Sequence, residues 1–137
     1  MTNYKMNGRR RWLAAVSALM LLAGCAGQAI HSEGLALLQQ GNYDAALTSL
    51  EEATRQAPAN IEFRMDFVRA REQAGNRFVV AGNEARIAER FDVAEEAYRQ
   101  ALRVIPESGR AKLGLEAVIM DRRHAGIVAQ AQRVLNK

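Results

Sequence analysis

The chain has 137 residues, a length that suits one modest domain. It contains one cysteine and two histidines, so an intramolecular disulfide is excluded and a zinc site has too few ligands of these types. The formal net charge of +4 would favour a nucleic-acid-binding protein only if the extra cations belonged to the folded part of the chain.

Residues 1–24 differ in character from everything that follows. They carry four cations between Lys5 and Arg11, no acidic residue, and an apolar run at 12–23 that only Ser17 interrupts. A basic segment followed by a run of this kind is typical of an export signal, and a permanent membrane helix would need about 20 apolar residues. We therefore predict a removable signal peptide at 1–24. Without its four cations the chain keeps fifteen Lys and Arg against fifteen Asp and Glu, a neutral balance that argues against nucleic acid as a partner.

Cys25 stands directly after Leu22-Ala23-Gly24, where the apolar run ends. This tetrapeptide resembles the lipobox of bacterial lipoproteins. The resemblance implies that the Cys25 thiol receives a diacylglyceryl group, that cleavage precedes it, and that the new terminus, residues 25–26, is acylated with a fatty acid such as palmitate. That covalent lipid is the only cofactor expected. Ala26 and Gly27, with no aspartate after the cysteine, imply sorting to the outer membrane, with the chain facing the periplasm. The alternative is an ordinary small-residue cleavage site beside an incidental cysteine.

Two stretches of the remaining chain, 27–60 and 75–108, align without a gap. Identical residues occupy equivalent positions in both, and these are Gly34 and Gly82, Asp44 and Asp92, Ala46 and Ala94, Ala53 and Ala101, and Pro58 and Pro106. Both stretches resemble tetratricopeptide repeats, whose unit is a pair of antiparallel helices. The resemblance implies an all-α fold, a solenoid of helical hairpins. The alternative is an amphipathic helical bundle in which small residues recur by chance.

The small residues and prolines have mechanical roles in such a repeat. Gly34 and Gly82 let the second helix approach the middle of the first, and the paired alanines allow the same approach from the other side. Proline ends the second helix because it lacks the amide hydrogen and clashes with the preceding turn. Gly41-Asn42 gives a sharp turn between the helices of the first repeat. The second repeat has Glu89-Arg90 there, which leaves its turn less defined by sequence.

The two repeats are separated by residues 61–74. Phe63, Phe67, Ala70 and Ala74 recur there at spacings of three and four, which predicts a spacer helix with one apolar face. The full period is therefore 48 residues, and it recurs. Residues 109–122 form a second predicted spacer helix, with apolar positions at Ala111, Leu113, Leu115 and Val118.

The third period begins at residues 123–137, which correspond to the first helix of an incomplete third repeat. Solenoid repeats bury their faces only against neighbouring repeats. We therefore expect this helix to expose its apolar residues and the chain to be the front of a longer protein; those residues are Ile127, Val128, Val134 and Leu135.

Partner contacts in the tetratricopeptide family usually come from the inner face of each first helix. Carried over by position, the resemblance implies candidate partner-binding residues at His31, Leu35, Leu38, Val79, Asn83 and Arg86. Asn83 matches the asparagine of the clamp with which some members hold a peptide carboxylate. Val79 stands where that clamp has lysine, so the clamp is incomplete.

No catalytic constellation is evident in the sequence, and we predict that the protein is not an enzyme. His31 and His124 are isolated histidines expected on solvated faces, and no metal site is expected. The pairs Glu51-Glu52 and Glu95-Glu96 are adjacent on a helix, so their carboxylates point in different directions. No glycine-rich phosphate loop is present.

The order of parts (lipobox, repeat, spacer helix, second repeat) is similar to the N-terminal region of some general-secretion-pathway secretins. That resemblance implies a membrane-anchored protein-interaction module of the cell envelope, within type II secretion or pilus machinery, with other envelope proteins as partners and an oligomeric state. The alternative is a free-standing adaptor lipoprotein, similar to repeat-bearing pilotins or outer-membrane assembly factors.

The lipid anchor gives the first testable prediction. Cys25→Ser leaves an unlipidated precursor, because a hydroxyl cannot replace the thiolate as acyl acceptor. Metabolic labelling with palmitate is expected to mark the parent chain and not the variant. Label incorporated equally into both would disprove lipidation at Cys25.

Overall fold

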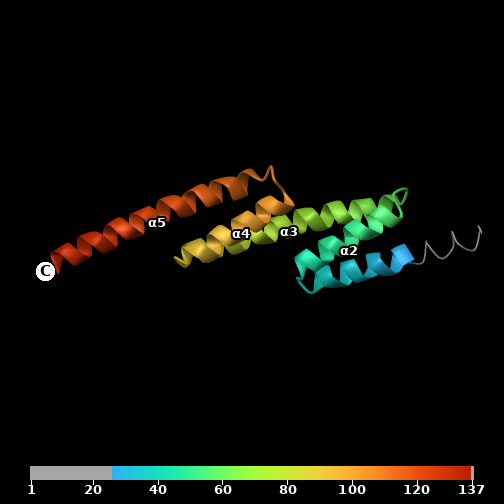
Figure 1. Cartoon of the computed structure of the whole chain (residues 1–137), viewed down its shortest axis with the longest axis horizontal. Helices are drawn as coiled ribbons and strands as arrows, with labels where there is room; N and C mark the ends of the chain where they lie inside the picture. The colour runs from blue at the N-terminus through green and yellow to red at the C-terminus, as the bar shows by residue number, and fades with distance from the viewer. Residues whose placement is uncertain (1–25, 137) are drawn as a thin grey trace, which may run out of the picture. The chain divides into compact units, whose positions relative to one another are not determined.

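The computed structural model describes residues 26–136, which are helical apart from short connections (Figure 1). Residues 26–39 are helical and are followed by α2 (Tyr43–Gln56), α3 (Ile61–Ile87), α4 (Phe91–Val104) and α5 (Gly109–Leu135). No strand occurs between residues 26 and 136. The predicted all-α fold is confirmed.

The 48-residue period holds at the level of single helix boundaries. The two 14-residue helices α2 and α4 begin and end 48 positions apart, and so do the two 27-residue helices α3 and α5. The caps repeat as well. The Asn60 side chain accepts a hydrogen bond from the Phe63 amide, and Ser108 accepts one from the Ala111 amide, both at 3.3 Å. Such caps satisfy amides that the first helical turn leaves unpaired.

The turn that differs in sequence between the repeats has the same conformation in both. Gly41 has φ of 78° and Glu89 has φ of 57°, and each donates its amide hydrogen to a carbonyl three residues earlier. Left-handed φ is a common way to end a helix, usually with glycine. A glutamate there is strained, so packing of the flanking helices must hold the second turn in shape.

The spacer segment at 61–74 and the repeat helix that follows it form one uninterrupted helix, α3. The same is true of 109–122 and the following residues, which together form α5. No proline lies within either helix, and the helical backbone of α3 continues through Gly75 and Asn76, a pair of residues that forms a turn at 41–42. Pro58 and Pro106 lie instead just beyond the ends of α2 and α4, where they stop those helices.

The structure divides into two compact units, with the boundary in α3 after Ala70. In the N-terminal unit, α2 lies against residues 26–39. A Cβ atom at Gly34 would come within 2.7 Å of the Leu50 side chain, so only glycine permits this approach. Ala46, Ala53 and Phe63 are buried with Leu50.

In the C-terminal unit the core is organised by Tyr98 of α4, which is fully buried. A Cβ atom at Gly82 of α3 would lie 2.7 Å from the Tyr98 ring, and one at Gly114 of α5 would lie 2.3 Å from it. The ring therefore occupies space that two neighbouring helices leave open by carrying glycine. Its hydroxyl donates a 2.6 Å hydrogen bond to Oδ1 of Asn83. Buried alanines of α4, including Ala94 and Ala101, complete the contact.

The predicted apolar faces are correct with one exception. Phe63, Ala70 and Ala74 are buried, as are Ala111 and Val118, but Leu113 is 67 % exposed. The expectation for Leu113 was wrong because the buried stripe repeats that of α3, and the residue 48 positions before Leu113 is the exposed Met65. The four apolar residues expected to be exposed near the end of α5 are exposed.

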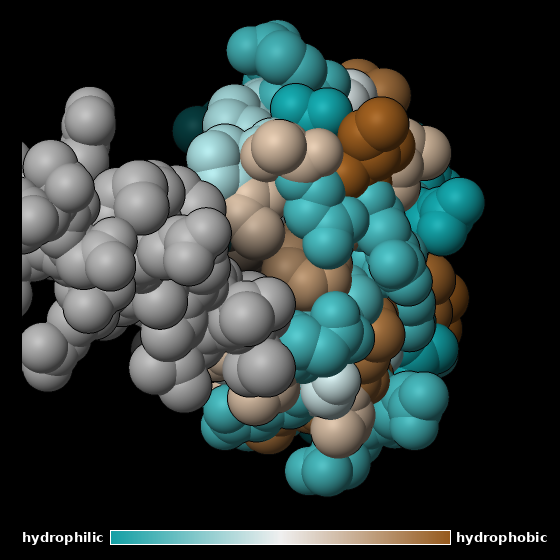
Figure 2. Space-filling model, turned by 90° about the vertical axis from the view of Figure 1, so that its right-hand side faces the viewer, coloured by the Kyte–Doolittle hydropathy of each residue, from teal (hydrophilic) through white to brown (hydrophobic). Residues whose placement is uncertain are grey.

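On the face shown in Figure 2, polar side chains are interspersed with scattered apolar ones, an arrangement that is ordinary for a protein surface. Within the part of the chain that the structure describes, no helix combines the length and apolar character that a membrane span needs.

Two glycines of α5 test the packing around Tyr98. Gly114→Ala places a methyl group into the Tyr98 ring and is expected to destabilise the protein by about 1–3 kcal/mol, as overpacking does. Gly126→Ala is the matched control, because no atom lies within 4 Å of its Cβ position. There the gain in helix propensity of about 1 kcal/mol should be realised. The midpoint temperature of thermal unfolding is thus expected to fall in the Gly114→Ala variant and to rise in the Gly126→Ala variant. A stabilised Gly114→Ala variant would contradict this packing.

Candidate functional site

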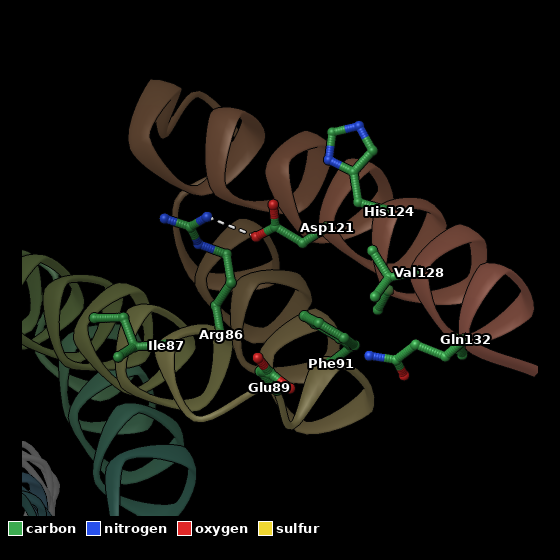
Figure 3. A pocket seen from close by; sticks show the side chains of 10 residues that line it. Arg86, Ile87, Glu89, Phe91, Asp121, His124, Val128 and Gln132 are labelled. Carbon is green, nitrogen blue, oxygen red and sulfur yellow. Dashed lines mark hydrogen bonds and ion pairs between the residues drawn. The ribbon is translucent and has the colours of Figure 1, made fainter. Parts of the chain in front are cut away.

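A groove of about 520 Å³ in the C-terminal unit is lined by α3, α4 and α5 (Figure 3). Arg86 and Ile87 come from the last turn of α3, and Phe91 from the first turn of α4. α5 contributes one face of its second half, with residues at spacings of three and four; these are Asp121, His124, Ala125, Val128, Ala129 and Gln132.

The lining combines an apolar surface with polar groups. Ile87 is 79 % exposed and Val128 is 54 % exposed, so the groove presents apolar surface to solvent. Phe91 is partly buried and packs against the core of the unit. Glu89, His124 and Gln132 add hydrogen-bonding groups. An apolar surface with a few polar groups is what a protein-binding groove requires.

One ion pair fixes the wall of this groove. Nη1 of Arg86 lies 2.7 Å from Oδ2 of Asp121, which joins the end of α3 to the middle of α5 (Figure 3). The hydrogen bond to Asp121 raises the pKa of Arg86, against the desolvation caused by burial. Nε of Arg86 is buried and has no hydrogen-bond partner among residues 26–136. Both side chains are about one third exposed, so we assign the pair a positional role.

A second, smaller groove of about 380 Å³ shares Arg86 with the first. It brings together three of the predicted partner-binding residues, Val79, Asn83 and Arg86. Val79 is nevertheless only 4 % exposed and belongs to the core. Asn83 is exposed, and Oδ1 of its side chain accepts the Tyr98 hydrogen bond.

The three candidates of the first repeat lie in the N-terminal unit. Leu35 and Leu38 are half-buried. His31 was expected on a solvated, partner-facing surface, and this expectation was wrong because His31 is 2 % exposed. Its ring stacks on Phe63 with centroids 4.3 Å apart, and its Nε2 lies 3.1 Å from Oδ2 of Asp66.

This His31–Asp66 pair was missed because Asp66 falls on the polar side of its helix. The aspartate reaches back to the first helix, and its carboxylate also accepts a hydrogen bond from Arg69. The equivalent pair in the second repeat is Val79 and Gly114, so the ionisable pair is particular to the N-terminal unit.

The structure also places His124 and the adjacent glutamates that the sequence analysis considered. His124 is exposed, as expected. Glu51 is exposed, whereas Glu95 is half-buried and accepts hydrogen bonds from Arg99 and from Arg122 of α5. Within residues 26–136 no group of three or more His, Cys, Asp and Glu is arranged to hold a metal ion. Cys25 and the signal segment lie outside the described residues.

Two family models match the chain. Each is described as a tetratricopeptide repeat, and they cover residues 37–77 and 79–115, together more than half of the sequence. The chain is a tetratricopeptide-repeat protein. A search of curated protein sequences gives no match. Tetratricopeptide repeats typically act as non-enzymatic scaffolds that mediate protein–protein interactions, which indicates an interaction module.

The His31–Asp66 contact of this repeat protein can be tested by a double-mutant cycle. Asp66→Ala leaves the buried imidazole without its acceptor and is expected to lower the free energy of unfolding by about 1–3 kcal/mol. In a His31→Val background the same change should cost less, because no buried polar group is then stranded. Arg69→Ala, which removes an exposed partner of Asp66, is the control and should change stability by about 0.5 kcal/mol or less. If the effects of Asp66→Ala and His31→Val on the free energy of unfolding are additive, the contact contributes nothing to stability.

Proposed function

We propose that this tetratricopeptide-repeat protein is a lipid-anchored protein-interaction module of the bacterial cell envelope that binds a segment of a partner protein in the groove of the C-terminal unit. The observation that carries the proposal is the groove itself, where exposed Ile87 and Val128 stand beside charged and amide side chains. An apolar side chain of the partner would rest on these two residues and on Phe91. The polar groups at the edge would bind its main chain.

The groove is suited to recognition because its walls are already fixed. The Arg86–Asp121 ion pair spans α3 and α5, and Phe91 is packed against the core. A binding surface that is ordered before the partner arrives loses less conformational entropy on association. We therefore place the main binding energy at the apolar side chains and assign the ion pair to holding them in position.

The proposed location follows from the sequence. A basic segment, an apolar run and the lipobox-like tetrapeptide before Cys25 support export and lipid attachment. Several acyl chains on one residue hold a protein firmly to a membrane, whereas one chain does so only marginally. We propose an outer-membrane, periplasm-facing location and a role in protein secretion, as the similarity to secretin N-terminal regions implies. A free-standing adaptor lipoprotein is the alternative.

Site-specific photo-crosslinking in intact cells tests the groove. With the crosslinking amino acid at Val128, we expect an adduct of defined mass with an envelope protein. Ile87→Glu should remove the adduct, because it places a charge on the apolar surface of the groove while leaving the fold intact.

Ile61→Glu is the matched control for that substitution. Ile61 is 66 % exposed and does not line the groove. This variant should leave the adduct unchanged. An adduct that survives Ile87→Glu, or one that both variants remove equally, would contradict binding in the groove, and an adduct with a cytoplasmic protein would contradict the envelope location.

A further inference from the structure

The turn between α3 and α4 keeps a glutamate where the backbone favours glycine. Among residues 26–136, Glu89 is the only residue other than glycine with a positive φ, at 57°. The equivalent turn of the first repeat has Gly41, with φ of 78°. Glycine adopts this conformation without strain, whereas a residue with a Cβ atom does not. Strained residues of this kind cluster at binding sites, so the strain points to a role for the Glu89 side chain.

That side chain brings an unbalanced negative charge to the groove of about 520 Å³ (Figure 3). Glu89 is exposed and forms no ion pair within the described residues. The lining contains one other acidic residue, Asp121, and one arginine, Arg86, and these two side chains pair with each other at 2.7 Å. The carboxylate of Glu89 is therefore the one acidic or basic group of the lining that has no partner of opposite charge.

The arginines that lie close to Glu89 in the chain or at the start of α4 do not neutralise it. Arg90 follows Glu89 directly, but it does not line the groove and forms no ion pair with Glu89. Nη2 of Arg122 lies 2.9 Å from a carboxylate oxygen of Asp92 and 2.9 Å from one of Glu95. An unpaired carboxylate beside an apolar surface is complementary to a cation on a binding partner.

From these observations we propose that the groove recognises a lysine or arginine beside the apolar residue of the partner segment, and that Glu89 sets this specificity. The inference rests on the proposed function, because it names the chemistry of the segment that the groove binds. The cation donates charge-assisted hydrogen bonds to the Glu89 carboxylate. Phe91 lines the same groove with a partly exposed side chain, and an aromatic ring attracts a cation as well. The neighbouring apolar side chain rests on Ile87 and Val128.

Selection of displayed random peptides tests this specificity. The full chain in detergent micelles is the bait, and peptides that also bind the Ile87→Glu variant are discarded because they do not need the groove. Lys and Arg are expected to be enriched about two- to fivefold among the remaining peptides, as a favourable contact with a single partly exposed charge allows. Groove-dependent peptides without this enrichment would overturn the inference and leave binding in the groove intact. A selection that yields no groove-dependent peptide would contradict the groove as well.

The dissociation constant of one selected peptide, measured by fluorescence anisotropy, isolates the contribution of Glu89. Glu89→Gln removes the charge at nearly constant size and should weaken binding about two- to fivefold. Glu84→Gln is the matched control, because Glu84 is an exposed residue of α3 that forms no ion pair and does not line the groove. This variant should leave the dissociation constant unchanged. Equal weakening by both variants would overturn a contact at Glu89.

A glycine at the same position separates binding from folding. Glu89→Gly should weaken binding of the selected peptide as Glu89→Gln does. It should also raise the midpoint temperature of thermal unfolding, because glycine relieves the left-handed backbone of the turn. A lower midpoint temperature in Glu89→Gly would mean that the glutamate serves the fold, and this result would overturn the assignment of Glu89 to partner recognition.

Discussion

The C-terminal unit depends on one close contact, in which the ring of Tyr98 fills space between Gly82 of α3 and Gly114 of α5. The distances from a Cβ atom at either glycine to the ring fall well below van der Waals contact, so both helices approach the ring more closely than a residue with a Cβ atom would allow. The Tyr98 hydroxyl is satisfied by Asn83 at 2.6 Å, which removes the penalty for burying it. Leu50 and Gly34 make the corresponding contact in the N-terminal unit, where an aliphatic side chain needs no hydrogen-bond partner.

This spacing has consequences for the groove. Because α5 is held close to α3 and α4, Asp121 comes within 2.7 Å of Arg86, and the second half of α5 projects past the start of α4. That projection places Val128 over Phe91 and leaves Ile87 open to solvent (Figure 3). The proposed binding surface is thus a product of where the helices end as well as how they pack.

Much of the fold could be predicted from the sequence because it repeats. Shared glycines, alanines and prolines fixed the register, and the 48-residue offset reproduces every boundary of α2 to α5. The same offset could have corrected Leu113 and would have drawn attention to Gly114, which corresponds to Asp66. What periodicity could not predict is contact between unlike residues of different helices. The carboxylate of Asp66 lies on the polar side of its helix and still contacts His31 of another helix. A residue-by-residue transfer of the family pattern cannot anticipate a contact of this kind.

The groove was only partly predictable for the same reason. Family position identified Arg86, but Asp121 and Val128 come from segments treated as a spacer and an unpaired end, and Phe91 was not singled out. The face of α5 that carries Asp121 and Val128 has helical periodicity, and this signal was present in the sequence. It could not be assigned to a groove until α3 and α4 were in place beside it.

The close contact around Tyr98 is tested most directly by nuclear Overhauser effects in the full chain. The account predicts strong cross-peaks from the Tyr98 ring protons to the Hα atoms of both Gly82 and Gly114, because both backbones touch the ring. Cross-peaks to Gly82 without any to Gly114 would mean that α5 does not pack as described. The groove and its Arg86–Asp121 wall would then have no structural basis.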